Sequence, residues 1–182
     1  MIYGESIVDG AEKDLLVKYL PDGGKFLEIG TWDGATVAYI LDHRPNATAV
    51  SVDNYGGGEG NAMPTSENLC NFFLNAQERK GKMSLFLGTS ELFSSLIGVG
   101  DFDLVFVDGD HGEEPAYRDI VRACAMSGLS RGTVAVHDVI KNPEGEVISH
   151  PGKALVRFLC DFPEYKVVES LNVTYIVQRA QK

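Results

Sequence analysis

The chain has 182 residues, of which 44% are hydrophobic and 23% charged, a composition typical of one globular domain over residues 1–182. Its net charge of −10 and pI near 4.8 remove the attraction that drives binding to nucleic acid or anionic membranes, so neither is an expected partner. No apolar run reaches the roughly 18 to 20 residues that cross a bilayer, and no signal-peptide pattern opens the chain, so we expect a cytoplasmic protein.

Strands and helices alternate along the chain until a final hairpin. In chain order, periodicity and turn residues predict helix 11–20, strand 25–30, helix 33–44, strand 47–53, helix 66–79 with Ser66 as N-cap, strand 83–87, helix 90–97, strand 101–107, helix 114–127, strand 133–137, helix 152–162 and strands 165–170 and 173–178. This order predicts an α/β fold with a doubly wound, mostly parallel seven-stranded sheet and an antiparallel C-terminal hairpin at one edge.

The cysteines do not suggest chemistry. Cys70, Cys124 and Cys160 are an odd number of thiols, lie far apart and each fall in a helical pattern. We therefore predict buried free thiols rather than a disulfide, a metal site or a nucleophile.

Polar residues collect where the predicted parallel strands end, which is where ligands bind in such sheets. These ends are Gly30, Asp53, Gly88, Asp108 and His137-Asp138. A strand end needs no Asp or His for its own stability, so the clustering indicates a binding site.

The segment 28–34, Glu-Ile-Gly-Thr-Trp-Asp-Gly, follows the first strand and opens a helix. Gly30 and Gly34 would let the backbone approach a ligand, while N–H groups at the helix start offer donors to an anion. Asp53, at the end of the next strand, is placed to accept both hydroxyls of a ribose. The two motifs together predict a nucleoside cofactor site.

With these motifs the chain resembles class I S-adenosylmethionine-dependent methyltransferases, in particular small-molecule O-methyltransferases of the catechol and macrocin type. Segment 28–34 looks like the family's first motif, and segments 103–111 and 132–138 resemble its fourth- and fifth-strand motifs. The resemblance implies S-adenosylmethionine as cofactor and a small hydroxyl-bearing molecule as substrate. It implies cofactor contacts from Glu28, Gly30, Thr31, Trp32, Gly34, Asp53, Asn54, Thr89, Ser90 and Asp108.

In the metal-dependent members, the acid that closes the fourth strand and two adjacent oxygen ligands that close the fifth hold magnesium. A base follows the first acid by three residues. The resemblance then implies Asp108, His137 and Asp138 as metal ligands and His111, with Asp108, as the catalytic pair. His137 departs from the pattern, because the family usually has a carboxylate there. An imidazole favours manganese or another borderline metal over magnesium, or no metal.

Several residues have a second interpretation. Glu28 either contacts the cofactor or pairs with a neighbouring donor, and His137 is either a ligand or a core histidine. Thr89 and Ser90 either approach the adenine or cap a helix. The loop 56–60 is either a lid or a connection.

Two other functions compete with a methyltransferase. A nicotinamide-dependent oxidoreductase also needs a ribose acid, but Trp32 and Asp33 place bulk and charge where its diphosphate would lie. A cofactor-binding module without catalysis would not need Asp108, His111 and Asp138. Because the loops that cover the site are short, the site is either open or completed by a second subunit, and we expect a homodimer.

Overall fold

A computed structural model describes residues 8–56, 65–128 and 132–180. Most of the glycine loop, residues 57–60, lies outside the described residues, so its interpretation as a lid is not tested. Within the described part, no helix is long and apolar enough to span a bilayer.

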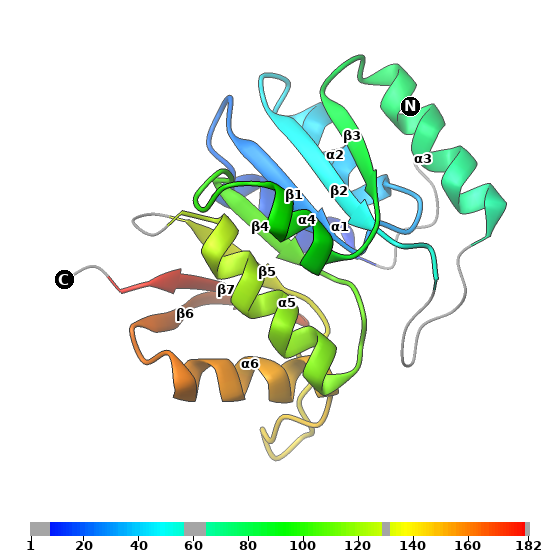
Figure 1. The fold of residues 1–182 in the computed structure, drawn as a ribbon. Helices are drawn as coiled ribbons and strands as arrows, with labels where there is room; N and C mark the ends of the chain where they lie inside the picture. Colours follow the sequence, from blue (N-terminus) through cyan, green and yellow to red (C-terminus); the bar gives the residue numbers. More distant parts are fainter. Residues whose placement is uncertain (1–7, 57–64, 129–131, 181–182) are drawn as a thin grey trace.

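The strands form a seven-stranded sheet in the order β3-β2-β1-β4-β5-β7-β6 (Figure 1). They are β1 Lys25–Ile29, β2 Thr48–Asp53, β3 Met83–Leu87, β4 Leu104–Val107, β5 Thr133–Val136, β6 Tyr165–Leu171 and β7 Thr174–Arg179. Strands β1 to β5 pair in parallel. Strand β7 is antiparallel to both β5 and β6. The predicted fold class is confirmed.

The antiparallel hairpin lies at one edge of the sheet, as predicted. Strand β7 inserts between β5 and β6 and leaves β6 outermost. Helix α6 carries the chain past the position next to β5, and the tight turn after Leu171 returns β7 into that gap.

Helices cover both faces of the sheet. They are α1 Gly10–Tyr19, α2 Ala35–His43, α3 Ser66–Glu78, α4 Ser90–Leu96, α5 Glu113–Met126 and α6 His150–Asp161. Figure 1 shows α4, α5 and α6 in front of the sheet, with α1 and α2 behind it. Each helix presents apolar residues to its own face, as doubly wound folds require.

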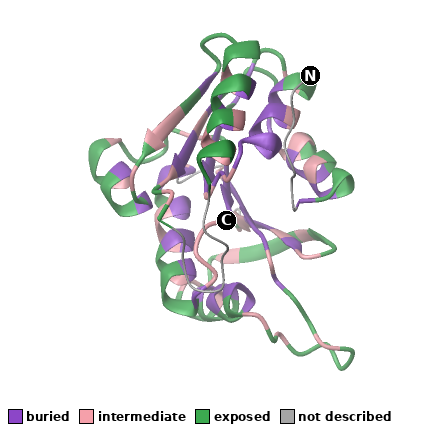
Figure 2. Cartoon of the chain, turned by 90° about the vertical axis from the view of Figure 1, so that its right-hand side faces the viewer, coloured by how far each residue is buried: buried purple, intermediate pink, exposed green. Residues whose placement is uncertain are grey.

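Side chains of the central strands alternate between the two faces. In β4, Val105 and Val107 pack with α5 and α6, whereas Leu104 and Phe106 pack with α1 and α2. All four are buried, and Figure 2 shows the buried residues running through the middle of the molecule. The same alternation continues past the strand ends, and it directs Asp108 and His137 toward the α1 side.

The structure corrects two helix starts and the cysteine prediction. Thr65, not Ser66, is the N-cap of α3, because its hydroxyl accepts the Asn68 N–H. Helix α6 begins at His150 with Ser149 as N-cap, two residues before the predicted start. Of the cysteines only Cys124 is buried, since Cys70 and Cys160 lie on outward helix faces; all three thiols are free.

Candidate functional site

The sheet register brings the predicted strand ends level with one another. Ile29 pairs with Val52 on one side and with Val107 on the other, and Val107 pairs with Val136. The next residues, Gly30, Asp53, Asp108 and His137, therefore lie along one edge of the sheet.

The packing of the fold requires both glycines of the turn after β1, whether or not a ligand binds there. Gly30 has φ +85°, and a Cβ there would overlap the Asp108 carbonyl oxygen. Gly34 has φ +76°, and its Cβ would overlap side-chain atoms of Met83 and Phe72. Close packing against β4, β3 and α3 thus explains both glycines, and it fastens the turn to the end of β4.

Asp53 holds this turn in place. Its Oδ2 accepts the backbone N–H groups of Thr31 at 2.9 Å and Trp32 at 3.3 Å, and its Oδ1 accepts the Tyr55 N–H at 2.7 Å. These bonds tie the backbone of the turn to the end of β2. Because Asp53 is only half-buried, the rest of its carboxylate faces outward beside Asn54, which is exposed.

Trp32 and Tyr55 flank Asp53 in left-handed backbone conformations, with φ of 53° and 51°. The Tyr55 hydroxyl donates to the Trp32 carbonyl at 2.8 Å. Non-glycine residues rarely adopt this conformation, and they concentrate at functional sites. Both residues remain partly exposed.

Glu28 lies behind the turn and is buried. Its carboxylate accepts the hydroxyls of Thr31 at 2.5 Å and Ser51 at 3.3 Å. Burial raises the pKa of Glu28 well above its usual value, although these hydrogen bonds oppose the shift. The structure thus gives Glu28 neighbouring donors, which was the second interpretation of the sequence.

The segment after β3 also has internal roles. Thr89 is the N-cap of α4, and its hydroxyl accepts the Leu92 N–H at 3.2 Å. Ser90 is buried, and its hydroxyl donates to Asp119 of α5. Thr89 is exposed, so of the two it is the side chain that a ligand could reach.

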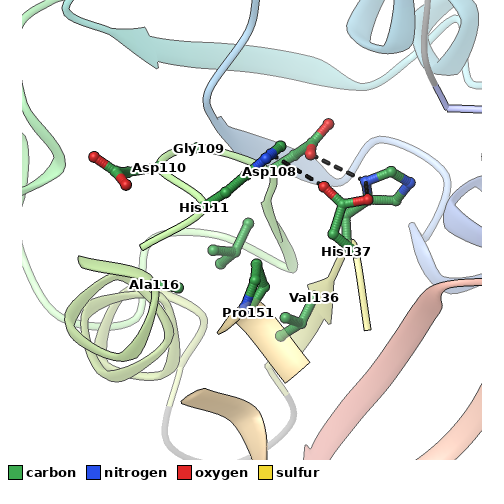
Figure 3. A pocket seen from close by; sticks show the side chains of 10 residues that line it. Asp108, Gly109, Asp110, His111, Ala116, Val136, His137 and Pro151 are labelled. Carbon is green, nitrogen blue, oxygen red and sulfur yellow. Dashed lines mark hydrogen bonds and ion pairs between the residues drawn. The ribbon is translucent and has the colours of Figure 1, made fainter. Parts of the chain in front are cut away.

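A cluster of two carboxylates and two imidazoles lies at the ends of β4 and β5 (Figure 3). His137 Nδ1 is 3.1 Å from Asp108 Oδ1 and 3.4 Å from Asp138 Oδ1. His111 Nε2 is 3.0 Å from Asp138 Oδ2. These four residues line a cleft that opens to solvent, with Gly109, Ala116 and Pro151 among its other walls.

Asp110 belongs to the same loop but serves a different purpose. Its carboxylate accepts the Gly112 N–H at 2.8 Å, just before α5 begins. In Figure 3 its side chain points away from His137 and Asp108. This turn brings His111 back over the cluster.

Mutual contacts set the charges of the cluster. Burial disfavours the charged form of His137, but interactions with Asp108 and Asp138 outweigh it and raise the pKa of His137 to about 10. The contact with His137 lowers the pKa of Asp138, and burial raises that of Asp108. Without a metal, a protonated His137 lies between two acids.

Asp138 has a left-handed backbone with φ of 58°. Ser149, the N-cap of α6, donates its hydroxyl to the Asp138 carbonyl at 2.5 Å and accepts the Ile140 N–H at 3.0 Å. One serine thus fixes both the start of α6 and the strained turn that aims Asp138 at His111.

The predicted ligands fit a divalent metal. Asp108, His137 and Asp138 each offer one ligand atom, and these atoms lie within 4.8 Å of one another. Two carboxylates with one imidazole suit Mn²⁺, Fe²⁺ or Zn²⁺ better than Mg²⁺, which prefers oxygen. A metal ion would compete with the proton for Nδ1 of His137.

The structure places the predicted residues in two adjoining groups. The residues predicted to contact the cofactor lie at or just after the ends of β1, β2, β3 and β4. The cluster of carboxylates and imidazoles lies at the ends of β4 and β5. Gly30 packs against the backbone of Asp108 and so joins the two groups. Sequence reasoning missed Glu12, Asp119 and Ser149. A serine before Pro151 was a readable N-cap signal for Ser149, whereas nothing in the sequence reveals the buried contacts of Glu12 and Asp119.

Comparison with known proteins identifies the family. The sequence matches a family model described as a methyltransferase domain over residues 27–139, which extends from β1 to the residue after Asp138. No curated protein matches the sequence.

Solved structures share the fold at low identity. A putative caffeoyl-CoA O-methyltransferase from Staphylococcus aureus has a TM-score of 0.71 and 11% identity, over 97% of this chain and 86% of that chain. The O-methyltransferase from Bacillus cereus in complex with SAH gives 0.69 and 11%, over 99% and 84%. A putative rRNA-methylase from Clostridium thermocellum gives 0.63 and 13%, over 95% and 97%. The matched segment covers more than half of the chain, which therefore belongs to the methyltransferase domain family and has the fold of class I S-adenosylmethionine-dependent methyltransferases.

Proposed function

We propose that this methyltransferase moves the methyl group of S-adenosylmethionine to a hydroxyl of a small molecule. The observation that carries the proposal is the cluster of Asp108, His111, His137 and Asp138 in one cleft beside the turn after β1. Carboxylates and imidazoles so arranged can orient a hydroxyl and remove its proton. The net charge of −10 favours an acceptor other than nucleic acid.

The cofactor would lie across the turn after β1. Gly30 and Gly34 shape this turn, Asp53 would accept the ribose hydroxyls with its outward side, and Trp32, Asn54 and Thr89 are exposed enough to contact the adenosine. Glu28, Thr31 and Ser90 would act behind them, because each is buried and hydrogen-bonded within the protein. The family match and the bulk of Trp32 count against a nicotinamide dinucleotide.

Methyl transfer forms an oxygen–carbon bond while the carbon–sulfur bond of the sulfonium breaks, and sulfur keeps the electron pair. The protein must therefore hold the two reactants in line and take one proton from the acceptor hydroxyl. We assign that proton to His111, because its Nε2 lies 3.0 Å from Asp138 Oδ2 and this carboxylate can stabilise the imidazolium that forms. Asp108 and Asp138 would orient the hydroxyl.

A divalent ion held by Asp108, His137 and Asp138 would lower the pKa of a bound hydroxyl. His111 lies at the rim of that set with its side chain partly exposed, so it can reach an acceptor there.

Replacement of the base tests the proposal. His111→Ala should lower kcat on a responsive catechol or sugar about 10²- to 10⁴-fold, because the acceptor proton then leaves unassisted. Calorimetry should find its affinity for S-adenosylmethionine unchanged. His43→Ala is the matched control, since His43 lies exposed at the end of α2 and contacts the Tyr39 carbonyl. An unchanged rate in His111→Ala would remove His111 from the mechanism, and a wild type inactive on all acceptors would favour a non-catalytic module.

A further inference from the structure

Glu12 of α1 is an acid where the fold calls for an apolar residue. It is 3% exposed, and it packs under the strand ends rather than on the outer face of its helix. Glu12 also caps α1 through its contact with Asp9, but this capping role does not require the side chain to be buried. A carboxylate buried this deeply needs partners that offset the loss of water.

The contacts of Glu12 hold its carboxylate in one orientation. Oε1 accepts the Thr174 hydroxyl at 2.9 Å and the Val173 N–H at 3.2 Å. Oε2 accepts the Asp9 N–H at 3.3 Å and lies 3.7 Å from Nε2 of His137. The start of α1 and the start of β7 therefore fix an acid against the Nε2 side of the His137 ring.

His137 lacks a hydrogen bond at that same nitrogen. Its Nε2 is buried and has no hydrogen-bond partner among the described residues, and Glu12 is the acid that faces it. Phe106 packs edge-on against the ring at 5.8 Å between centroids. The ring thus has one nitrogen toward Glu12 and the other toward Asp108 and Asp138.

This arrangement decides which nitrogen of a neutral imidazole carries the proton. A carboxylate at Nε2 favours the tautomer with hydrogen on Nε2, which leaves the Nδ1 lone pair facing the two acids. Histidines that bind metals commonly donate their second N–H to a carboxylate in this way, which fixes the ring and strengthens the ligand.

We infer that Glu12 is a positioning residue that turns Nδ1 of His137 toward Asp108 and Asp138, and thereby makes the cluster prefer Mn²⁺ to Mg²⁺. The inference rests on the proposed function, because it concerns the same cleft. It adds a residue of α1 to the site and a class of metal.

Metal affinity in the isolated protein tests this inference. Electron paramagnetic resonance of free Mn²⁺ measures binding, and competition with Mg²⁺ measures preference. We expect Glu12→Gln to weaken Mn²⁺ binding about 10- to 100-fold. Glu169→Gln is the matched control: the same change of side chain removes a carboxylate that contacts α1 through Lys18 and Tyr19 rather than through His137, so Mn²⁺ affinity should stay unchanged.

A double-mutant cycle separates positioning from folding. In a His137→Asn background, Glu12→Gln should cause no further loss of Mn²⁺ affinity, because the group it acts through is absent. An equal loss in both backgrounds would overturn the inference, as would a wild type that binds no Mn²⁺ or prefers Mg²⁺. Methylation by a wild type that binds no Mn²⁺ would overturn this inference while the proposed function stands. If Mn²⁺ affinity changes as the double-mutant cycle predicts but the protein methylates no acceptor, this inference stands and the proposed function fails.

Discussion

At the scale of single residues, the acids near the turn after β1 differ in burial and in their hydrogen-bond donors. Glu28 and Asp53 both point toward the turn after β1, yet Glu28 is buried among hydroxyls whereas Asp53 accepts backbone N–H groups at the surface. Burial therefore raises the pKa of Glu28, whereas Asp53 acts as the acceptor that fixes the backbone of the turn.

Glu28→Gln tests the buried acid. The raised pKa means that protonated Glu28 stabilises the fold, an effect complete below about pH 4.5 and lost as pH rises through the higher folded pKa. Above pH 4.5 the wild type should lose stability relative to Glu28→Gln by up to about 1.4 kcal/mol per pH unit. Urea unfolding of both proteins from pH 4 to 8 measures the difference, and parallel stability profiles would show that Glu28 folds with an ordinary pKa.

At the scale of elements, the turn between β1 and α2 carries the site because three neighbours hold it. Asp53 binds its N–H groups, the end of β4 leaves no room beside Gly30, and α3 and β3 leave none beside Gly34. The sequence alone predicted a turn here and assigned its glycines to a ligand. It could not show this packing, because Phe72 and Met83 lie about 40 residues or more away along the chain.

Gly30→Ala should measure how tightly this turn is packed. The left-handed φ alone costs an alanine about 1–2 kcal/mol, and overlap with the Asp108 carbonyl adds to that loss. Gly81→Ala is the control, since Gly81 has φ +73° but open space where a Cβ would lie. Chemical denaturation should find Gly30→Ala clearly less stable than Gly81→Ala, and equal losses would mean that the close approach to β4 has no energetic weight.

At the scale of the whole molecule, patterns along the chain predicted what is repetitive and missed what depends on long-range contacts. The alternation of apolar strands and amphipathic helices was enough to predict the doubly wound sheet. The positions of the strand ends were enough to predict that Asp108, His137 and Asp138 lie close together. The insertion of β7 beside β5 joins segments about 40 residues apart, and the contact of Glu12 with His137 joins residues 125 apart. No local pattern encodes them.

The central claim is that donor and acceptor meet between the turn after β1 and the cluster at the ends of β4 and β5. A crystal structure of the protein with bound S-adenosylhomocysteine tests it most directly. We expect the ribose hydroxyls on Asp53, the adenosine beside Trp32, and the sulfur facing the cleft of Asp108, His111 and Asp138. A ligand bound on another edge of the sheet, or with its sulfur turned away from that cleft, would contradict the account.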